Sequence, residues 1–238
     1  MVDVEKDYKA KVIDIWKKFK NINTLDKNGF EYRKSPLLPK YVIKNTILFV
    51  GINPSFTKNS IIEVSNREIE FYQLVNNAEN EIQYFKKFRN IAEYCNISNW
   101  THLDLFFLRE TNQKIIEELS YSNVDFLQEQ LNVSFDIIKK ATPKIIIVSN
   151  SLASEFFGKK KAKHCKLPKI WAGYDLDFSS KNFDKDLGTY LIMINDKKVP
   201  ILFTSMLSGQ RALDIGSFER LKWQVKMILE KMDKKAGW

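Results

Sequence analysis

The sequence has few of the residues that build disulfide frameworks, metal centres or phosphate-binding loops. Cys95 and Cys165 are the only cysteines among 238 residues, and only His164 stands next to one of them. Two cysteines are too few for a disulfide framework, and their spacing lacks the paired ligands of a zinc site. The chain also has no glycine-rich phosphate loop and no Ser-His-acid arrangement typical of hydrolases. We therefore expect no metal and no bound cofactor.

Long apolar runs are missing as well. The longest, such as 145–148 and 201–203, are far shorter than the roughly 20 residues of a membrane-spanning helix. The first seven residues include acidic side chains and lack the apolar core of a secretory signal. These absences predict a cytoplasmic protein without a membrane partner, and no feature of the sequence predicts an obligate protein partner.

Positive charge is in excess. Lys and Arg total 38 against 29 Asp and Glu, which gives a formal net charge of +9 and a pI near 9.3. An excess of this sign favours a polyanionic partner, and nucleic acid first. The alternative is a lysine-rich surface that has no such partner. Within the basic run that begins at residue 159, the candidates for contacts with DNA phosphates are Lys159, Lys160 and Lys161.

The hydrophobic pattern predicts one α/β domain over residues 1–238. Helical spacing of apolar residues and continuous apolar runs alternate along the chain. This order predicts a three-layer α/β/α sandwich around a mostly parallel sheet of about four strands, with ligands bound at the carboxyl ends of the strands. Strands are expected at 46–50, 100–108, 144–149, 189–194 and 199–204. Helices are expected at 7–19, 60–96, 124–140, 151–157 and 218–232.

A short motif follows the first of these strands directly. It reads Gly51-Ile52-Asn53-Pro54-Ser55. With the apolar strand before it, the motif resembles the first motif of the uracil-DNA glycosylase superfamily, most closely the Gly-Ile-Asn-Pro form of its mismatch-specific and thymine-DNA branches. The resemblance implies a glycosylase-like fold and cleavage of an N-glycosidic bond after the target nucleotide has been flipped out of the DNA.

Each residue of the motif has a physical reason to be there. Gly51 permits a close approach that a side chain would obstruct, and Pro54 fixes the turn that follows. Asn53 would orient the attacking water with its amide oxygen, so catalysis would depend on positioning and electrostatics rather than on proton abstraction. Gly51, Ile52, Pro54 and Ser55 would then border the flipped base. The alternative is an ordinary turn between a strand and a helix.

The loop after the last strand departs from the family's second motif. In the family this loop is often His-Pro-Ser or Asn-Pro-Ser, and it contacts the leaving base and inserts an apolar wedge into the DNA. The corresponding residues 204–211 contain neither His nor Pro. Ser205 and Ser208 are therefore the candidates to stabilise the leaving base. Candidates for DNA contacts, with either of the first two as the wedge, are Met206, Leu207, Gly209, Gln210 and Arg211. Alternatively, Met206 and Leu207 complete a core strand.

Further candidates for the base pocket lie in the middle of the chain. Phe56 and Tyr72 could stack on a flipped base, although aromatic residues at helical spacing are also typical of a core. Asn150 ends the third strand and would face the same rim. Near the end of the second strand, family analogy implies that a polar residue reads the edge of the base. Asp104, Arg109 and Asn112 are the options, and the alternative for Asp104 is a buried structural carboxylate paired with Arg109.

The function predicted from these residues is excision of a base from DNA. The enzyme would flip out a deaminated, mismatched or modified base and hydrolyse its glycosidic bond with a positioned water. Two alternatives stay open. One is a non-catalytic nucleic-acid-binding protein with a glycosylase-like fold, and the other is an α/β enzyme that acts on free nucleosides or nucleotides.

Overall fold

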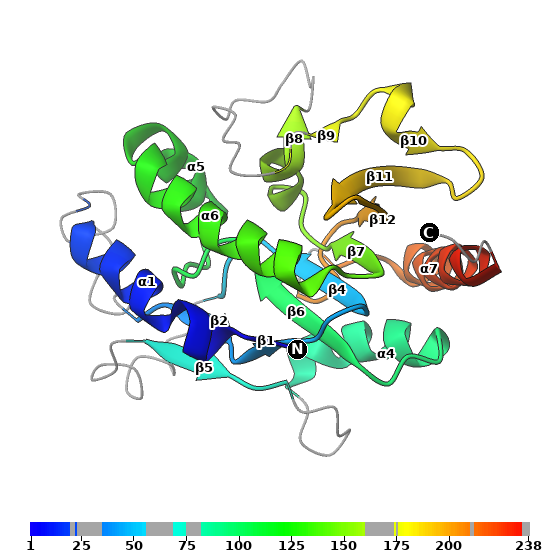
Figure 1. Ribbon diagram of the computed structural model, residues 1–238, viewed down its shortest axis with the longest axis horizontal. Helices are drawn as coiled ribbons and strands as arrows, with labels where there is room; N and C mark the ends of the chain where they lie inside the picture. Colours follow the sequence, from blue (N-terminus) through cyan, green and yellow to red (C-terminus); the bar gives the residue numbers. More distant parts are fainter. Residues whose placement is uncertain are drawn as a thin grey trace.

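A computed structural model describes residues 1–19, 22, 35–55, 69–74, 82–159, 174, 176–209 and 212–234. In these ranges the central sheet has six strands, in the order β10-β11-β12-β7-β4-β6 (Figure 1). Strands β12, β7, β4 and β6 run parallel, and β11 and β10 extend the sheet antiparallel. The fold is therefore α/β with a mostly parallel sheet. The six strands are β4 (Ile47–Gly51), β6 (Trp100–Asp104), β7 (Ile145–Val148), β10 (Phe183–Asp184), β11 (Thr189–Ile194) and β12 (Lys197–Phe203).

Helices cover both faces of this sheet. Ile47 and Phe49 of β4 pack into the hydrophobic cluster under α4 and α7, while Leu48 and Val50 pack into the cluster under α1, α5 and α6. Figure 1 shows these two groups of helices on opposite sides of the sheet. Burial on both faces explains why β4 is apolar without alternation. The helices are α1 (Val4–Lys18), α4 (Lys86–Tyr94), α5 (Gln113–Ser122), α6 (Val124–Ala141) and α7 (Ile215–Lys234), with short 3-10 turns η3 (Gln83–Phe85), η4 (Ala153–Phe157) and η5 (Ser180–Asn182).

The sheet is wider than expected because β10, which was not expected, pairs with β11 at one edge. Asn195 and Asp196 join β11 to β12 with φ of 48° and 63°. Two consecutive residues with positive φ form the turn that matches the twist of a hairpin, and Asn and Asp tolerate this conformation. The strands expected at 189–194 and 199–204 are both present, and the turn between them is shorter than that spacing predicts because Lys197 and Lys198 already pair with β11.

The helix expected over 60–96 is wrong at its centre. Residues 70–72 form strand β5 (Glu70–Tyr72), which pairs in parallel with β2 (Leu37–Pro39). Pairing with a distant segment overrides the local helical spacing. The helix is confirmed only at α4, and residues 60–68 and 75–81 lie outside the described ranges. The other two-stranded sheets pair β1 (Val2–Asp3) with β3 (Tyr41–Val42) and β8 (Gly158–Lys159) with β9 (Leu176–Asp177).

The strand expected over 100–108 ends early. Strand β6 stops at Asp104, but the next two residues still donate backbone hydrogen bonds to the loop after β4: Leu105 to the Gly51 carbonyl at 3.1 Å and Phe106 to the Ile52 carbonyl at 2.9 Å. The loop after β4 is thereby held against the chain that follows β6. Strand β4 lies between β6 and β7. From β4 the chain continues to β6 on one side of β4 and then to β7 on the other side. This reversal of strand order creates the crevice where α/β sheets bind ligands.

Across the described ranges, none of the helices combines the length and the apolar character needed to cross a bilayer. The expected helices at the two ends of the chain are confirmed by α1 and α7, and the one at 124–140 by α6. Helix α5 was not expected. It begins after Asn112, whose side-chain oxygen accepts a hydrogen bond from the Lys114 backbone and caps the helix.

Candidate active site

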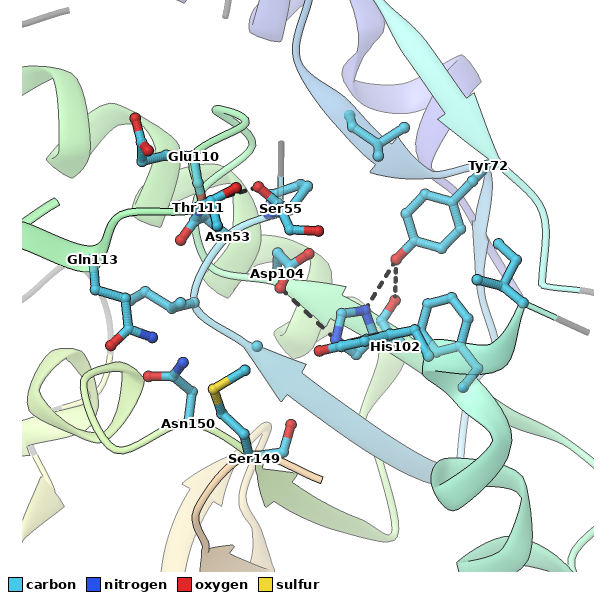
Figure 2. A pocket seen from close by; sticks show the side chains of 18 residues that line it. Asn53, Ser55, Tyr72, His102, Asp104, Glu110, Thr111, Gln113, Ser149 and Asn150 are labelled. Carbon is cyan, nitrogen blue, oxygen red and sulfur yellow. Dashed lines mark hydrogen bonds and ion pairs between the residues drawn. The ribbon is translucent and has the colours of Figure 1, made fainter. Parts of the chain in front are cut away.

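A pocket of about 310 Å³ lies beyond the carboxyl ends of β4, β6 and β7 (Figure 2). Its position is the crevice at the switch point of the sheet, and its volume lies within the range of small-molecule sites. The loop 51–55 lines it, together with the aromatic residues Tyr72, Tyr84 and Phe85. All five residues of the motif therefore border one cavity, as does Tyr72.

Asn53 is held by the backbone around it. Its side-chain nitrogen lies 2.6 Å from the carbonyl oxygen of Glu110, 3.0 Å from that of Pro54 and 3.4 Å from that of Leu108. Because carbonyl oxygens only accept, the amide must present its NH₂ group to them. Within the described ranges the amide oxygen Oδ1 accepts no hydrogen bond, so it is the group that remains for a ligand.

Gly51 makes room for a carboxyl group. A Cβ atom at this position would lie 2.1 Å from Oδ1 of Asp104 and 3.0 Å from Nε2 of His102. The first distance is far shorter than any van der Waals contact, so alanine does not fit here without displacing the acid. The close approach expected from the motif exists, and its partner is the side chain of Asp104, which faces Gly51 in the β4–β6 register.

His102 and Asp104 form a buried pair beside the motif. They are 2% and 7% exposed, and His102 Nε2 lies 3.8 Å from Asp104 Oδ1. Burial raises the pKa of Asp104 from 3.8 to about 8. Burial also lowers the pKa of His102 from 6.5 to about 3. Desolvation penalises the charged form of each group, so near neutral pH the acid is mostly protonated and the imidazole is neutral.

Tyr72 orients the imidazole from the opposite side. Its hydroxyl lies 3.1 Å from the carbonyl oxygen of His102 and 3.2 Å from the ring Nδ1 of the same residue. The hydroxyl has one proton, which it donates to the carbonyl, so Nδ1 must carry the proton of the second hydrogen bond. Nε2 is then the unprotonated nitrogen, and it faces Asp104. Aromatic side chains also pack against the imidazole of His102, with the ring centroids of Phe85 and Phe88 5.3 and 5.4 Å away.

Asn150 contributes a second amide to the pocket. Its side-chain oxygen accepts hydrogen bonds from the backbone of Leu152 at 2.8 Å and of Ala153 at 3.2 Å, which fixes the start of η4. The side-chain oxygen of Asn150 therefore has a structural role at the start of η4. The side-chain nitrogen remains as a hydrogen-bond donor for a bound molecule.

The loop after β12 reaches the pocket through one residue. Met206 lines the pocket with Asn53, so both loops lie at the same end of the sheet, as expected. Leu207 is 1% exposed and belongs to the core under α7, so the expected DNA contact of Leu207 is wrong for this arrangement. Ser208 donates its hydroxyl proton to the Tyr84 carbonyl at 2.6 Å. Ser205 and Gly209 are exposed, and neither serine lines the pocket.

Of the other residues considered from the sequence, some lie away from the pocket and some lie outside the described ranges. Arg109 pairs with Glu70 and donates to the Ser35 carbonyl at 3.2 Å, so the suggested pairing of Asp104 with Arg109 is wrong. Lys159 lies in β8. The remaining candidates fall outside the described ranges: Phe56, Lys160, Lys161, Gln210 and Arg211.

Sequence reasoning missed several pocket residues, and Tyr84 and Gln113 are two of them. Tyr84 stands in an aromatic segment whose spacing looks like a core helix, so no local signal separates it from Phe85. Gln113 opens a helix that was not expected. The cap residue Asn112 was the available signal, because Asn before a helical pattern marks a helix start.

No protein-family model matches this sequence, and no curated protein matches it either. Among the side chains that the structure describes, no three of His, Cys, Asp or Glu gather closely enough to hold a metal ion. The chemistry of the pocket in these ranges is therefore that of three side-chain amides, two carboxyl groups, an imidazole, hydroxyl groups and aromatic rings. These groups suit a neutral, planar, polar-edged ligand.

Proposed function

We propose that this protein is a DNA glycosylase of the uracil-DNA glycosylase type. It flips a deaminated, mismatched or modified base into the pocket and cleaves the N-glycosidic bond with a water held by Asn53. The observation that carries the proposal is the amide of Asn53, whose nitrogen is bound to backbone carbonyls while its oxygen remains for a ligand. The position of this amide at the carboxyl ends of parallel strands supports the glycosylase-like fold as well.

The geometry of Asn53 suits the positioning of a nucleophile. Oδ1 accepts a hydrogen bond from the water and directs a lone pair of the water oxygen toward the anomeric carbon. Because the backbone already fixes the amide, little entropy is lost when the water is ordered for attack. An amide does not remove the proton in the transition state, so the rate depends on alignment and on stabilisation of the separating charges.

The rest of the pocket suits a nucleobase. Tyr72, Tyr84 and Met206 supply apolar surface against which a flat ring packs, and Asn150 supplies a donor for its edge. Glycosylases read a flipped base by stacking and edge contacts of this kind. The resemblance of the motif to the glycosylase family and the shape of the pocket therefore support the same substrate class.

Contacts with the DNA backbone have candidates on the rim. Lys86 and Lys114 are exposed, and each directly follows a residue that lines the pocket, Phe85 and Gln113. Lysines at the mouth of a base pocket neutralise the phosphates that flank the flipped nucleotide. The net charge of +9 supports the same partner. Replacing either lysine by alanine reduces the salt dependence of DNA binding by about one phosphate contact.

A panel of oligonucleotides tests the proposal. Each carries one deaminated, mismatched or modified base, in duplex and single-stranded form, and abasic product is detected by alkaline cleavage and mass of the released base. We expect release from at least one member of the panel. DNA binding without release from any member would support the non-catalytic alternative, and release from free nucleosides but not from oligonucleotides would support the nucleoside enzyme.

A further inference from the structure

The proposed reaction needs a donor for the departing base. When the glycosidic bond breaks, its electron pair goes to the base, and the developing negative charge is stabilised by a hydrogen bond or removed by a proton. The loop after β12 has no histidine for this purpose, and neither Ser205 nor Ser208 lines the pocket. A donor must come from another wall of the pocket.

Two carboxyl groups line the pocket, those of Asp104 and Glu110, and one oxygen of Glu110 already accepts a hydrogen bond from the backbone of Asn112 at 2.7 Å. Burial raises the pKa of the Tyr72 and Tyr84 hydroxyls, so they hold their protons firmly. The pocket-facing nitrogen of His102 is unprotonated, because Nδ1 carries the proton that bonds to Tyr72. Asp104 lines the same pocket, and its side chain is 10% exposed there. Figure 2 shows its carboxyl directed into the space between Asn53 and His102.

The surroundings of Asp104 favour the neutral acid. Gly51 of β4 contacts it closely and carries no charge. The titratable groups that line the pocket with it are His102 from its own strand, Tyr72 from β5, Tyr84 from η3 and Glu110 from the loop after β6. Within the described ranges no lysine or arginine lines the pocket, so these elements offer no positive charge to stabilise the carboxylate.

We propose that Asp104 is a catalytic residue of the proposed glycosylase reaction and donates its proton to the leaving base. This inference rests on the proposed function. The bond between the anomeric carbon and the base nitrogen breaks, the electron pair stays on the base, and the base takes the proton of Asp104 and leaves neutral. The water held by Asn53 bonds to the anomeric carbon and releases one proton to solvent. Asp104 takes a proton back from solvent, so atoms and charges balance.

His102 acts in this scheme as a positioning residue. Its unprotonated Nε2 faces Oδ1 of Asp104 at 3.8 Å, and Tyr72 holds the imidazole in that tautomer. This distance is longer than a hydrogen bond, and Nε2 has no hydrogen-bond partner among the described residues, so it is an acceptor that the neutral acid reaches by a small movement of either side chain. The bound base then competes for the same proton. The base class that fits has an acceptor, a carbonyl oxygen or a ring nitrogen, on the edge that meets Asp104.

The test is the pH profile of single-turnover base release, measured on the oligonucleotide that the wild-type protein cleaves best. We expect the wild-type rate to fall about tenfold per pH unit once Asp104 ionises, near pH 8. Asp104→Asn keeps a neutral donor without an acidic proton. Its rate near pH 7 should be lower by about tenfold or more, and its alkaline limb should be absent. Asp233→Asn makes the same chemical change at an exposed residue far from the pocket and should retain the wild-type profile.

These measurements test the role of Asp104 and the glycosylase activity separately. Base release by Asp104→Asn with the wild-type alkaline limb would overturn the role of Asp104 and leave the glycosylase proposal intact. A wild-type protein that releases no base from any oligonucleotide would remove both. An infrared difference spectrum between wild type and Asp104→Asn gives a readout without substrate. A protonated carboxyl band at pH 6 that disappears with rising pH supports the inference, and a carboxylate already present at pH 6 contradicts it.

Discussion

Different interactions determine the properties of the two sides of the pocket. On the amide side, Asn53 and Asn150 are fixed by hydrogen bonds to the backbone, which use one end of each amide and leave the other for a ligand. On the acid side, burial lowers the pKa of His102 and raises that of Asp104, so both groups are mainly neutral. Changes on the amide side should therefore act through geometry at every pH. Substitutions on the acid side should alter how the rate of base release and the stability depend on pH.

A large effect is expected at Gly51, where the two sides of the pocket meet. Gly51→Ala places a methyl group against Asp104 Oδ1, so Asp104 or the loop must move. We expect base release to fall on the order of a hundredfold, and the free energy of unfolding to drop by about 1–3 kcal/mol. Urea denaturation and single-turnover rates measure these changes.

The double variant Gly51→Ala with Asp104→Ala sharpens the comparison. If the clash with the acid causes the loss of stability, removing the acid should recover part of it, and the two changes will not be additive. Additive losses of stability would show that the methyl group is excluded by something other than Asp104.

A smaller effect is expected at Asn150, where the two ends of one amide have separate tasks. Asn150→Asp keeps the oxygen that caps η4 but lacks the donor for the base, so base release should fall about tenfold with little change in stability. Asn150→Ala loses the cap as well and should also cost about 1 kcal/mol. Thermal melting and the rate of base release separate the two tasks. An Asn150→Asp protein as active as wild type would remove Asn150 from the site.

Asp104 should make the stability of the protein depend on pH in an unusual direction. Its folded pKa of about 8 exceeds the unfolded value of 3.8, so the folded state binds the proton more tightly and loses stability as the pH rises from about 4 to about 8. Asp104→Asn cannot ionise, so its stability relative to wild type should increase over this range by more than about 1 kcal/mol. His102 is present in both proteins and its titration largely cancels. Urea denaturation at pH 5 and pH 8.5 checks this, and an unchanged difference would contradict the buried neutral acid.

The smallest effect is expected at Ser208. Its hydroxyl proton is engaged by the Tyr84 carbonyl at the surface of the molecule. Ser208→Ala should cost about 0.5–1 kcal/mol and change the rate per folded molecule only a few-fold. A loss of rate comparable to that of Asp104→Asn would instead return Ser208 to the role of a donor to the leaving base.

The strands and the motif could be predicted from the sequence because their signals are local. The residues of β4 and β7 are apolar throughout, which parallel strands covered on both faces require, and the motif follows β4 directly. Asp104 was a candidate from the sequence, but its arrangement with Gly51 and His102 could not be predicted. The contact of Gly51 with Asp104 depends on the register between β4 and β6, and no pattern near either residue specifies that register.

The hydrogen-bond partners of Asn53 could not be predicted from neighbouring residues in the sequence either. Its nitrogen donates to the carbonyls of Leu108 and Glu110, more than fifty positions along the chain. Aspartate at this position would retain an oxygen that can bind water. The structure adds that a carboxylate cannot donate to those carbonyls, so Asn53→Asp is expected to lose stability and the fixed orientation of the side chain.

The central claim is that Asn53 positions the attacking water, and the most direct measurement is base release by Asn53→Ala with protein in excess over DNA. Loss of the hydrogen bonds to backbone carbonyls should cost about 1–2 kcal/mol, so the rate is expressed per folded molecule and DNA binding is measured in parallel. We expect binding close to wild type and a rate lower by a factor on the order of a hundred or more. An Asn53→Ala protein that binds DNA and releases the base at the wild-type rate per folded molecule would contradict the claim.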